Sequence, residues 1–276
     1  MRIAALQIDV SQNKRENIDK IEQVITSLSD KKIDMVILPE MFLCPYQTHL
    51  FEEYSEVEGG VTWQRLSHTA KTNNVYLVAG SVPEYKDGQI YNTSYVFDRN
   101  GKQIAKHRKI HLFDIDVENG QSFKESDVLS VGYEPTVFTT EFGKFGLCIC
   151  YDFRFPELSR IMVDKGAEAI IVPAAFNMTT GPSHWDILFR TRALDNQLFT
   201  LGVAPARNSA TGYTSWGHSI VVSPWGEIID QLKQFEDILL VDLDFALVSQ
   251  VRTELPLLAH RRHDVYSIES PVALKK

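Results

Sequence analysis

The sequence is poor in cysteine and lacks long apolar runs. Only three cysteines occur among 276 residues, Cys44, Cys148 and Cys150. So few cysteines, and an odd number of them, exclude a disulfide framework and fit a reducing compartment. No stretch reaches about 18 consecutive apolar residues, and residues 1–10 lack a basic segment ahead of an apolar one, so we expect neither a membrane span nor an export signal. The sequence therefore predicts a cytoplasmic protein.

Basic residues are also fewer than acidic residues. Lysine and arginine total 28 against 36 aspartates and glutamates, which gives a formal net charge of −8. A field of that sign opposes binding to phosphate backbones and to anionic membranes. A glycine-rich phosphate loop is missing as well, since Gly59-Gly60 and Gly80 are isolated turn glycines. We therefore expect no nucleic-acid partner, no membrane partner and no cofactor.

What is present is an ordinary globular composition, 44% hydrophobic and 23% charged, over a length that one large α/β domain uses. The chain opens with a strand–helix–strand pattern at residues 2–8, 17–28 and 35–38. No linker or repeat divides it, so we predict one domain, with a core of about residues 2–252 and a polar tail of about 253–276. Further strands are expected at 75–82, 91–98, 102–106, 145–150, 169–173, 200–204, 220–223 and 227–231, and helices at 63–72, 156–165 and 183–196. Turn residues at 100–101 and 224–226 predict two hairpins.

The strongest local pattern surrounds Cys150, where an apolar strand turns polar at Tyr151-Asp152 before a helix that begins with a proline. In α/β sheets such an elbow raises a nucleophile at the carboxyl end of a strand, and the following backbone N–H groups can face an oxyanion. The alternative is that Cys148 and Cys150 are both small core residues. That alternative stands for Cys148, whereas the polar residues beside Cys150 favour a nucleophile.

A thiol with an ordinary pKa of ~8.5 is mostly protonated at neutral pH, so it needs a base or a nearby cation. Glu40 stands behind a proline at the end of a buried strand, where burial raises the proton affinity of a carboxylate, as a general base requires. The alternative is a solvated loop glutamate. In the cationic stretch 106–114, period-two alternation places His107, Lys109 and His111 on one face. Here the alternative is a solvated basic edge strand.

A buried-strand glutamate, a strand-end lysine and an elbow cysteine thus occur in that chain order. With these residues the sequence resembles the nitrilase superfamily of carbon–nitrogen hydrolases, whose Glu-Lys-Cys triad is carried by three such segments. The resemblance implies an α/β fold, namely an α-β-β-α sandwich of two mixed sheets, and a homodimer. It covers nearly the whole chain, through the segments 4–7, 38–40, 106–116, 150–154 and 223–227.

The resemblance assigns roles to individual residues. Glu40 corresponds to the general base, Lys109 to the cation that stabilises the tetrahedral intermediate, and Cys150 to the nucleophile. Glu125 corresponds to a second glutamate that assists in this family, although the local sequence alone would make it a surface charge. The backbone N–H of Tyr151 is the expected second donor to the oxyanion, beside Lys109.

Within the superfamily, the segments 109–116 and 176–185 resemble the ω-amidase branch, whose substrates are 2-oxoglutaramate and 2-oxosuccinamate. Branches that act on deaminated glutathione or on N-carbamoyl amino acids share the triad and stay as alternatives. A substrate carboxylate needs a fixed cation, and Arg154 is the first candidate because its planar guanidinium can pair bidentately. Arg192 is the second candidate, and either arginine could instead form a structural ion pair. The other expected substrate-binding residues are Tyr46 and Phe176.

Two other classes of protein compete for the same residues. A zinc site could draw on the histidines and cysteines, but Cys-x-Cys inside an apolar strand lacks the usual Cys-x₂-Cys ligand spacing, so we expect no metal. A protein of this fold that binds without turnover is the other class, because triad residues do not prove catalysis. The sequence favours an amidohydrolase that converts a terminal amide to a carboxylate and ammonia through a cysteine thioester.

Overall fold

The structure, a computed structural model, describes residues 1–118, 121–210 and 212–268. It contains two six-stranded sheets, each with three parallel strands at its centre and antiparallel strands at its edges. The first sheet has the order β14 (Asp237–Asp242), β1 (Arg2–Gln7), β2 (Met35–Ile37), β3 (Tyr76–Lys86), β4 (Gln89–Phe97) and β5 (Gln103–Arg108). The second has the order β13 (Ile228–Gln231), β12 (Ile220–Val222), β11 (Phe199–Val203), β10 (Ala169–Pro173), β9 (Gly143–Leu147) and β8 (Thr136–Thr140).

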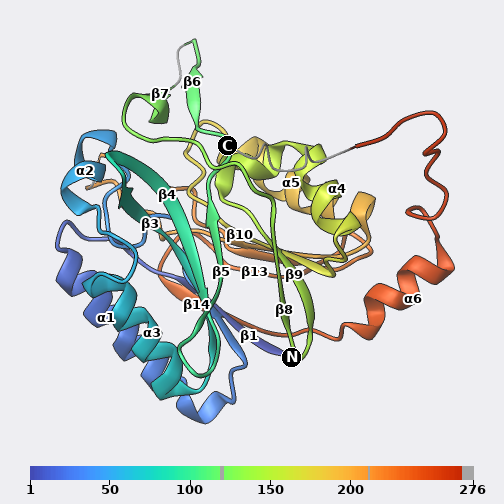
Figure 1. Ribbon diagram of the computed structural model, residues 1–276, viewed down its shortest axis with the longest axis horizontal. Helices are drawn as coiled ribbons and strands as arrows, with labels where there is room; N and C mark the ends of the chain where they lie inside the picture. The colour runs from blue at the N-terminus through green and yellow to red at the C-terminus, as the bar shows by residue number, and fades with distance from the viewer. Residues whose placement is uncertain (119–120, 211, 269–276) are drawn as a thin grey trace.

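Helices cover the outer faces of both sheets. Figure 1 shows α1 (Lys14–Ser27) and α3 (Val61–Asn73) on one side of the strands, and α4 (Pro156–Asp164) and α5 (Gly181–Asn196) on the other. These four layers confirm the predicted α-β-β-α sandwich. The remaining helical segments are α2 (Phe51–Tyr54), α6 (Ala246–Glu254) and the 3₁₀ turns Ser29–Lys31, Thr48–Leu50, Glu125–Asp127 and Cys150–Arg154. No helix among the described residues is both long and apolar enough to cross a membrane.

The space between the two sheets is filled by apolar side chains. Ile37 and Val78 of the first sheet lie in the same core cluster as Phe145 and Leu201 of the second, and all four are fully buried. Separate clusters lie between each sheet and its helices. The central strands are therefore covered on both faces, which explains why the sequence shows continuous apolar runs there instead of alternation.

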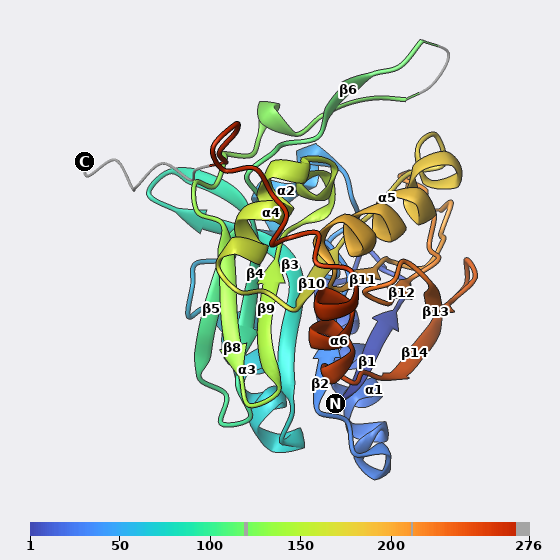
Figure 2. The ribbon, with the colours of Figure 1, turned by 90° about the vertical axis from the view of Figure 1, so that its right-hand side faces the viewer.

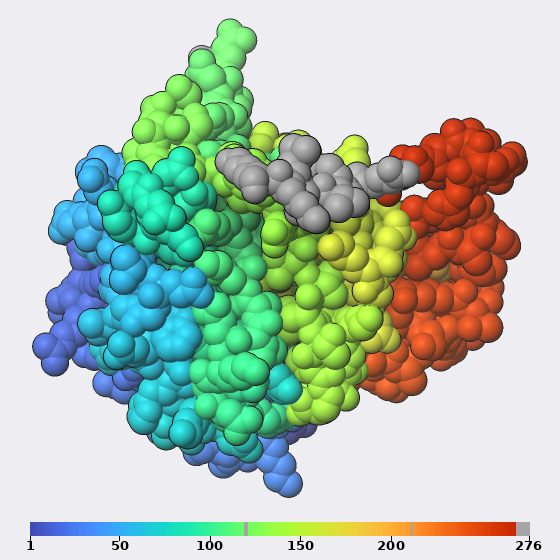
Figure 3. All heavy atoms as spheres, in the orientation of Figure 1, coloured from blue at the N-terminus to red at the C-terminus, as the bar shows by residue number. Residues whose placement is uncertain are grey.

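Both hairpins expected from turn residues are present. β4 pairs with β5 around Gly101, and β12 pairs with β13 around Gly226. Both glycines have a positive φ, 77° and 83°, a conformation that glycine adopts without a steric penalty. The hairpin formed by β6 (Asp114–Asp116) and β7 (Ser122–Lys124) was not predicted, because its three-residue strands carry little apolar pattern. It projects from the body of the molecule in Figures 1, 2 and 3.

The ends of four strands set the position of the site. β2 ends three residues before Glu40, β9 three residues before Cys150, and β5 immediately before Lys109. β10 ends two residues before Ala175. Because the carboxyl ends of parallel strands meet at one edge of a sheet, these segments converge at the top of the sandwich.

Candidate active site

Cys150 begins the 3₁₀ turn that follows β9, and its backbone has a φ of +47°. This left-handed conformation costs a non-glycine residue about 1–3 kcal/mol, so the surrounding structure must hold the turn in place. The side chain is buried. Burial raises the pKa of the Cys150 thiol well above its ordinary value, and the nearby negative charge of Glu40 raises it further. The thiol is therefore protonated at neutral pH and needs a base before it can attack.

The Lys109 ammonium stands at the centre of the buried polar cluster. It lies 3.0 Å from Oε1 of Glu40, 2.9 Å from Oε1 of Glu125 and 3.2 Å from the hydroxyl of Tyr46. Burial acts to lower the pKa of Lys109, but the charges of Glu125 and Glu40 outweigh it, so the pKa is raised above its ordinary value. Three acceptors for three N–H groups keep this ammonium charged and fixed in direction.

Glu40 is fully buried and uses both of its oxygens. Oε1 accepts hydrogen bonds from Asn92 at 2.9 Å and from Lys109, and it lies 2.9 Å from the hydroxyl of Tyr46, whose one proton Glu40 and Glu125 share. Oε2 accepts from the backbone N–H of Ala175 at 2.8 Å. The alternative of a solvated loop glutamate is therefore wrong. The Glu40 charge and the Ala175 amide also act on the sulfur of Cys150, so the carboxylate and the thiol belong to one buried cluster.

Glu125 completes the cluster from the 3₁₀ turn after β7. Its Oε2 accepts a 2.7 Å hydrogen bond from the backbone N–H of Phe113, and its Oε1 accepts bonds from Lys109 and Tyr46. Burial raises the pKa of Glu125, although the Lys109 charge opposes that shift. The surface position expected from the local sequence is wrong, because Glu125 is fully buried.

Arg154, at the end of the elbow turn, places a cation close enough to Cys150 for the two side chains to interact electrostatically. Its guanidinium carbon lies 4.6 Å from the ring centre of Phe176 and 5.7 Å from that of Tyr151. Its Nη1 is 3.0 Å from Nδ1 of His184, and burial followed by the arginine charge lowers the pKa of His184, which therefore accepts this bond as a neutral ring. Among the described residues, no carboxylate forms an ion pair with Arg154.

The other predicted arginine lies elsewhere. Nη2 of Arg192 donates a 2.9 Å hydrogen bond to the backbone carbonyl of Arg154, and Nη1 lies 3.7 Å from Asp195. The structure does not bring this guanidinium into the cluster around Lys109. Its contacts hold the backbone of the elbow turn, which is the structural alternative that the sequence left open.

The alternation expected for residues 107–111 is only partly present. β5 ends at Arg108, but the backbone N–H of Lys109 still donates to the carbonyl of Asn92 on β4, and the Lys109 side chain points to the two glutamates. His107 and His111 instead both contact Asp152, at 2.9 Å and 2.8 Å. Lys109 and the two histidines therefore have different partners, whereas Arg108 between them turns the other way and binds Glu84.

Sequence reasoning missed several polar groups of the site. Asn92 is fully buried on β4, in a run with Thr93 and Ser94, and a polar run within a buried strand was the available signal. Tyr213 lies buried against the cluster, and its hydroxyl donates to the carbonyl of Ala175. The polar run did not show that Asn92 lies next to Glu40, and no local pattern marked Tyr213.

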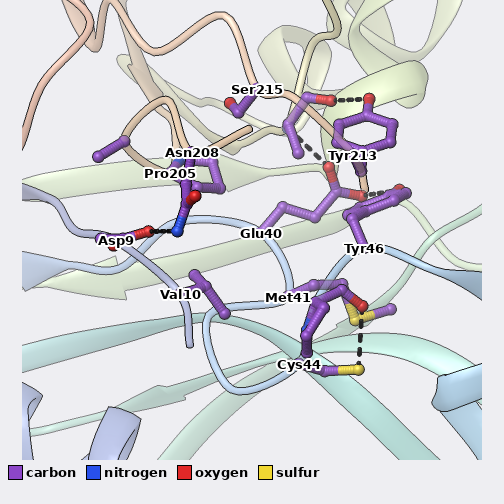
Figure 4. Close-up of a pocket in the computed structure, with 13 residues that line it drawn as sticks. Asp9, Val10, Glu40, Met41, Cys44, Tyr46, Pro205, Asn208, Tyr213 and Ser215 are labelled. Carbon is purple, nitrogen blue, oxygen red and sulfur yellow. Dashed lines mark hydrogen bonds between the residues drawn. The ribbon is translucent and has the colours of Figure 1, made fainter. Parts of the chain in front are cut away.

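A cavity of about 30 Å³ adjoins Glu40. Figure 4 shows Asp9 and Asn208 on one side of it and Tyr46 and Tyr213 on the other, with Glu40 between them. Asn208 donates a 2.7 Å hydrogen bond to Asp9. The cavity therefore has polar walls at both ends, as a space for bound water requires.

No group of three or more His, Cys, Asp or Glu side chains in the described part of the chain is arranged to hold a metal ion.

Comparison with known sequences gives consistent similarities along the chain. The family model described as carbon-nitrogen hydrolase matches residues 2–253. The sequence is 44% identical to omega-amidase NIT2 of Xenopus tropicalis over 97% of both chains, and 42% identical to omega-amidase NIT2 of Mus musculus over 98% of both chains. A hydrolase of Schizosaccharomyces pombe is 46% identical over the whole of this chain and 86% of its own length.

Solved structures show the same fold. A Saccharomyces cerevisiae protein described as a member of branch 10 of the nitrilase superfamily matches with a TM-score of 0.87 and 39% identity, over 95% of this chain and 96% of its own. The NitFhit protein of C. elegans matches with a TM-score of 0.87 and 30% identity, over 97% of this chain and 66% of its own.

Proposed function

The chain belongs to the carbon–nitrogen hydrolase family, and from this premise we propose that it is an ω-amidase, which hydrolyses the terminal amide of 2-oxoglutaramate or 2-oxosuccinamate to the 2-oxo dicarboxylate and ammonia. Relatives named omega-amidase that match over nearly their whole length support this activity. The observation that carries the mechanism is the buried ammonium of Lys109. It lies between Glu40 and Glu125, and its charge acts on the Cys150 thiol.

The first half-reaction forms a thioester. Glu40 takes the proton of the Cys150 thiol as the sulfur bonds to the amide carbon, and the carbonyl electron pair moves onto oxygen. The Lys109 ammonium and the backbone N–H of Tyr151 stabilise this oxyanion. When the oxyanion collapses, the C–N bond breaks and the nitrogen takes the proton from Glu40, so that ammonia leaves.

The second half-reaction hydrolyses that thioester. Glu40 removes a proton from water as the oxygen adds to the thioester carbon, which forms a second oxyanion beside Lys109. The C–S bond then breaks, and the sulfur of Cys150 recovers its proton from Glu40. The cycle consumes one water and one amide, and it releases one carboxylic acid and one ammonia.

Arg154 is the proposed clamp for the substrate carboxylate, because its charge has no anionic partner among the described residues. Replacement by lysine keeps the charge but removes the bidentate fork. We expect Arg154→Lys to raise KM for 2-oxoglutaramate by about tenfold, the effect of ~1.4 kcal/mol, and to change KM for an uncharged short amide less than threefold. Steady-state ammonia release on both substrates measures the difference, and equal changes would exclude the clamp.

An assay across substrates tests the function itself. Ammonia release is compared for 2-oxoglutaramate, deaminated glutathione, N-carbamoyl-β-alanine and a simple aliphatic nitrile. The proposal expects the highest kcat/KM for 2-oxoglutaramate. A higher value for deaminated glutathione or for the carbamoyl compound would move the chain to those alternative branches, and no turnover of any substrate would favour a binding protein of the same fold.

We also propose that the protein pairs into homodimers through α5. Ile187 and Leu194 on this helix are 62% and 52% exposed, and Trp225 of the adjoining hairpin is 49% exposed. We expect Leu194→Asp to shift the sedimentation coefficient to that of a monomer at micromolar concentration, since a charge within an apolar contact is costly. The matched control is Val61→Asp, on α3, where an exposed valine is changed and no shift is expected. A monomeric wild-type chain would contradict the pairing.

A reducing compartment such as the cytoplasm is the proposed location. The three cysteines are free and buried, and burial raises the pKa of the thiols of Cys44 and Cys148 as well as that of Cys150. A catalytic thiol requires conditions that keep it reduced. Cell fractionation followed by immunoblotting tests this location.

A further inference from the structure

The Asp152 carboxylate, two residues after Cys150, has no part in the proposed chemical steps, yet it accepts five hydrogen bonds in a fully buried position. Oδ1 accepts from the backbone N–H groups of Ile110 and His111, at 3.1 and 2.8 Å, and from Nδ1 of His111 at 2.8 Å. Oδ2 accepts from the backbone N–H of Ile149 at 3.1 Å and from Nε2 of His107 at 2.9 Å.

These donors bracket two of the proposed catalytic residues. His107 precedes Lys109 by two residues, and the N–H groups of Ile110 and His111 directly follow it. Ile149 immediately precedes Cys150. One carboxylate thus connects the segment that carries the ammonium to the turn that carries the sulfur, two segments about 40 residues apart in sequence.

The charge of Asp152 is compatible with this position. Burial acts to raise its pKa, but the hydrogen bonds from His107 and His111 outweigh it, so the pKa lies well below its ordinary value. Because an ionised carboxylate only accepts hydrogen bonds, Nε2 of His107 and Nδ1 of His111 both carry a proton. All five contacts are therefore satisfied in a single protonation state.

The connection also supports the strained nucleophile. Cys150 has a φ of +47°, and Asp152 lies in the same 3₁₀ turn, where its side chain reaches back to the N–H of the residue before the cysteine. A side chain that bonds backward in this way fixes the first turn as an N-terminal cap does. Such a strained conformation persists only when its surroundings over-determine it.

We propose that Asp152 is a positioning residue that sets the separation of the Lys109 ammonium and the Cys150 sulfur by binding both of their backbone segments at once. Asparagine at this position has nearly the same shape, but its NH₂ group would face N–H donors on one side. The two segments would then lose their common acceptor. The inference rests on the proposed roles of Lys109 and Cys150.

Glu84 provides the matched control. It is a fully buried carboxylate that binds the other face of the same strand, through Nε and Nη2 of Arg108 at 2.7 and 2.8 Å and through Thr93 at 2.7 Å. It has no hydrogen bond to the turn at residues 149–154 among the described residues. Glu84→Gln therefore removes a buried charge next to β5 without touching the link to Cys150.

The experiment compares Asp152→Asn with Glu84→Gln in the full chain. We expect Asp152→Asn to lower kcat for ammonia release from 2-oxoglutaramate at least tenfold with KM changed less than threefold, and to slow alkylation of Cys150 by iodoacetamide at least tenfold, measured by peptide mass. Glu84→Gln should keep both rates within threefold of wild type, even if its melting temperature falls as far as that of Asp152→Asn. Since alkylation needs no physiological substrate, it tests the positioning even if the proposed ω-amidase activity fails.

Two results would overturn the inference. One is an Asp152→Asn protein with kcat and alkylation within threefold of wild type. The other is a Glu84→Gln protein whose kcat and alkylation rate fall as much as those of Asp152→Asn, because the loss would then follow from removing any buried carboxylate. If Asp152→Asn does not fold, the test uses His107→Phe, which keeps a ring at this position and removes one donor to Asp152. A kcat lowered more than threefold at unchanged KM supports the inference, and an unchanged kcat rejects it.

Discussion

Cys150→Ala is expected to abolish ammonia release, with kcat lowered by about 10⁴-fold or more. Without the sulfur no thioester can form, and the remaining groups can only polarise the amide for direct attack by water, which is a far slower reaction. The change deletes one buried atom and leaves Glu40, Lys109 and Glu125 in their mutual hydrogen bonds. We therefore expect a folded protein, with a melting temperature close to that of the wild type, that still binds substrate.

Cys148→Ala is the matched control for that variant. Cys148 is also fully buried, two residues earlier, but it lies in the apolar cluster against α4 and α5. Its loss should lower stability slightly and leave kcat within threefold of wild type. Mass spectrometry of enzyme quenched during turnover should find an acyl adduct on the wild type and on Cys148→Ala, and none on Cys150→Ala. Turnover by purified Cys150→Ala would disprove the nucleophile assignment.

The residues at the strand ends could be predicted from sequence, because the burial of a central strand shows in its own local sequence. Central parallel strands covered on both faces read as continuous apolar runs, so each run ends visibly where the chain leaves the core. Glu40 and Cys150 lie just beyond the ends of β2 and β9, and the structure confirms both of these positions. Edge strand β14 escaped prediction, since its stability depends on pairing with β1 at the opposite end of the chain.

Glu125 shows why the rest of the site could not be predicted from local pattern. Its neighbours are polar, and a lone carboxylate in such a segment is normally solvated. It is buried only because Lys109, Tyr46 and the N–H of Phe113 satisfy it, and none of these contacts is local in sequence. The link from His107 to Asp152 has the same character, with 45 residues between the partners. Only the family resemblance brought Glu125 into the expected site.

Lys109→Ala is the second change with a large expected effect, and it acts on both catalysis and stability. Loss of one oxyanion donor costs ~2.7–4 kcal/mol of barrier, so kcat should fall by about 100-fold or more. The same change leaves the buried carboxylates of Glu40 and Glu125 without their shared cation. Removing one partner from a buried ion pair destabilises a protein by about 3–5 kcal/mol, so the melting temperature should fall as well.

The two effects separate by pH and by a second substitution. Without Lys109, the pKa of the buried Glu125 carboxyl rises further above its unfolded value. The folded state then binds more protons than the unfolded state, so stability falls as the pH rises from the unfolded pKa through the folded pKa of this group. Adding Glu125→Gln removes the unpaired charge and should restore much of the lost stability while leaving kcat low. Recovery of kcat in the double variant would mean that Lys109 serves only to neutralise Glu125, and its assignment to the oxyanion would then be wrong.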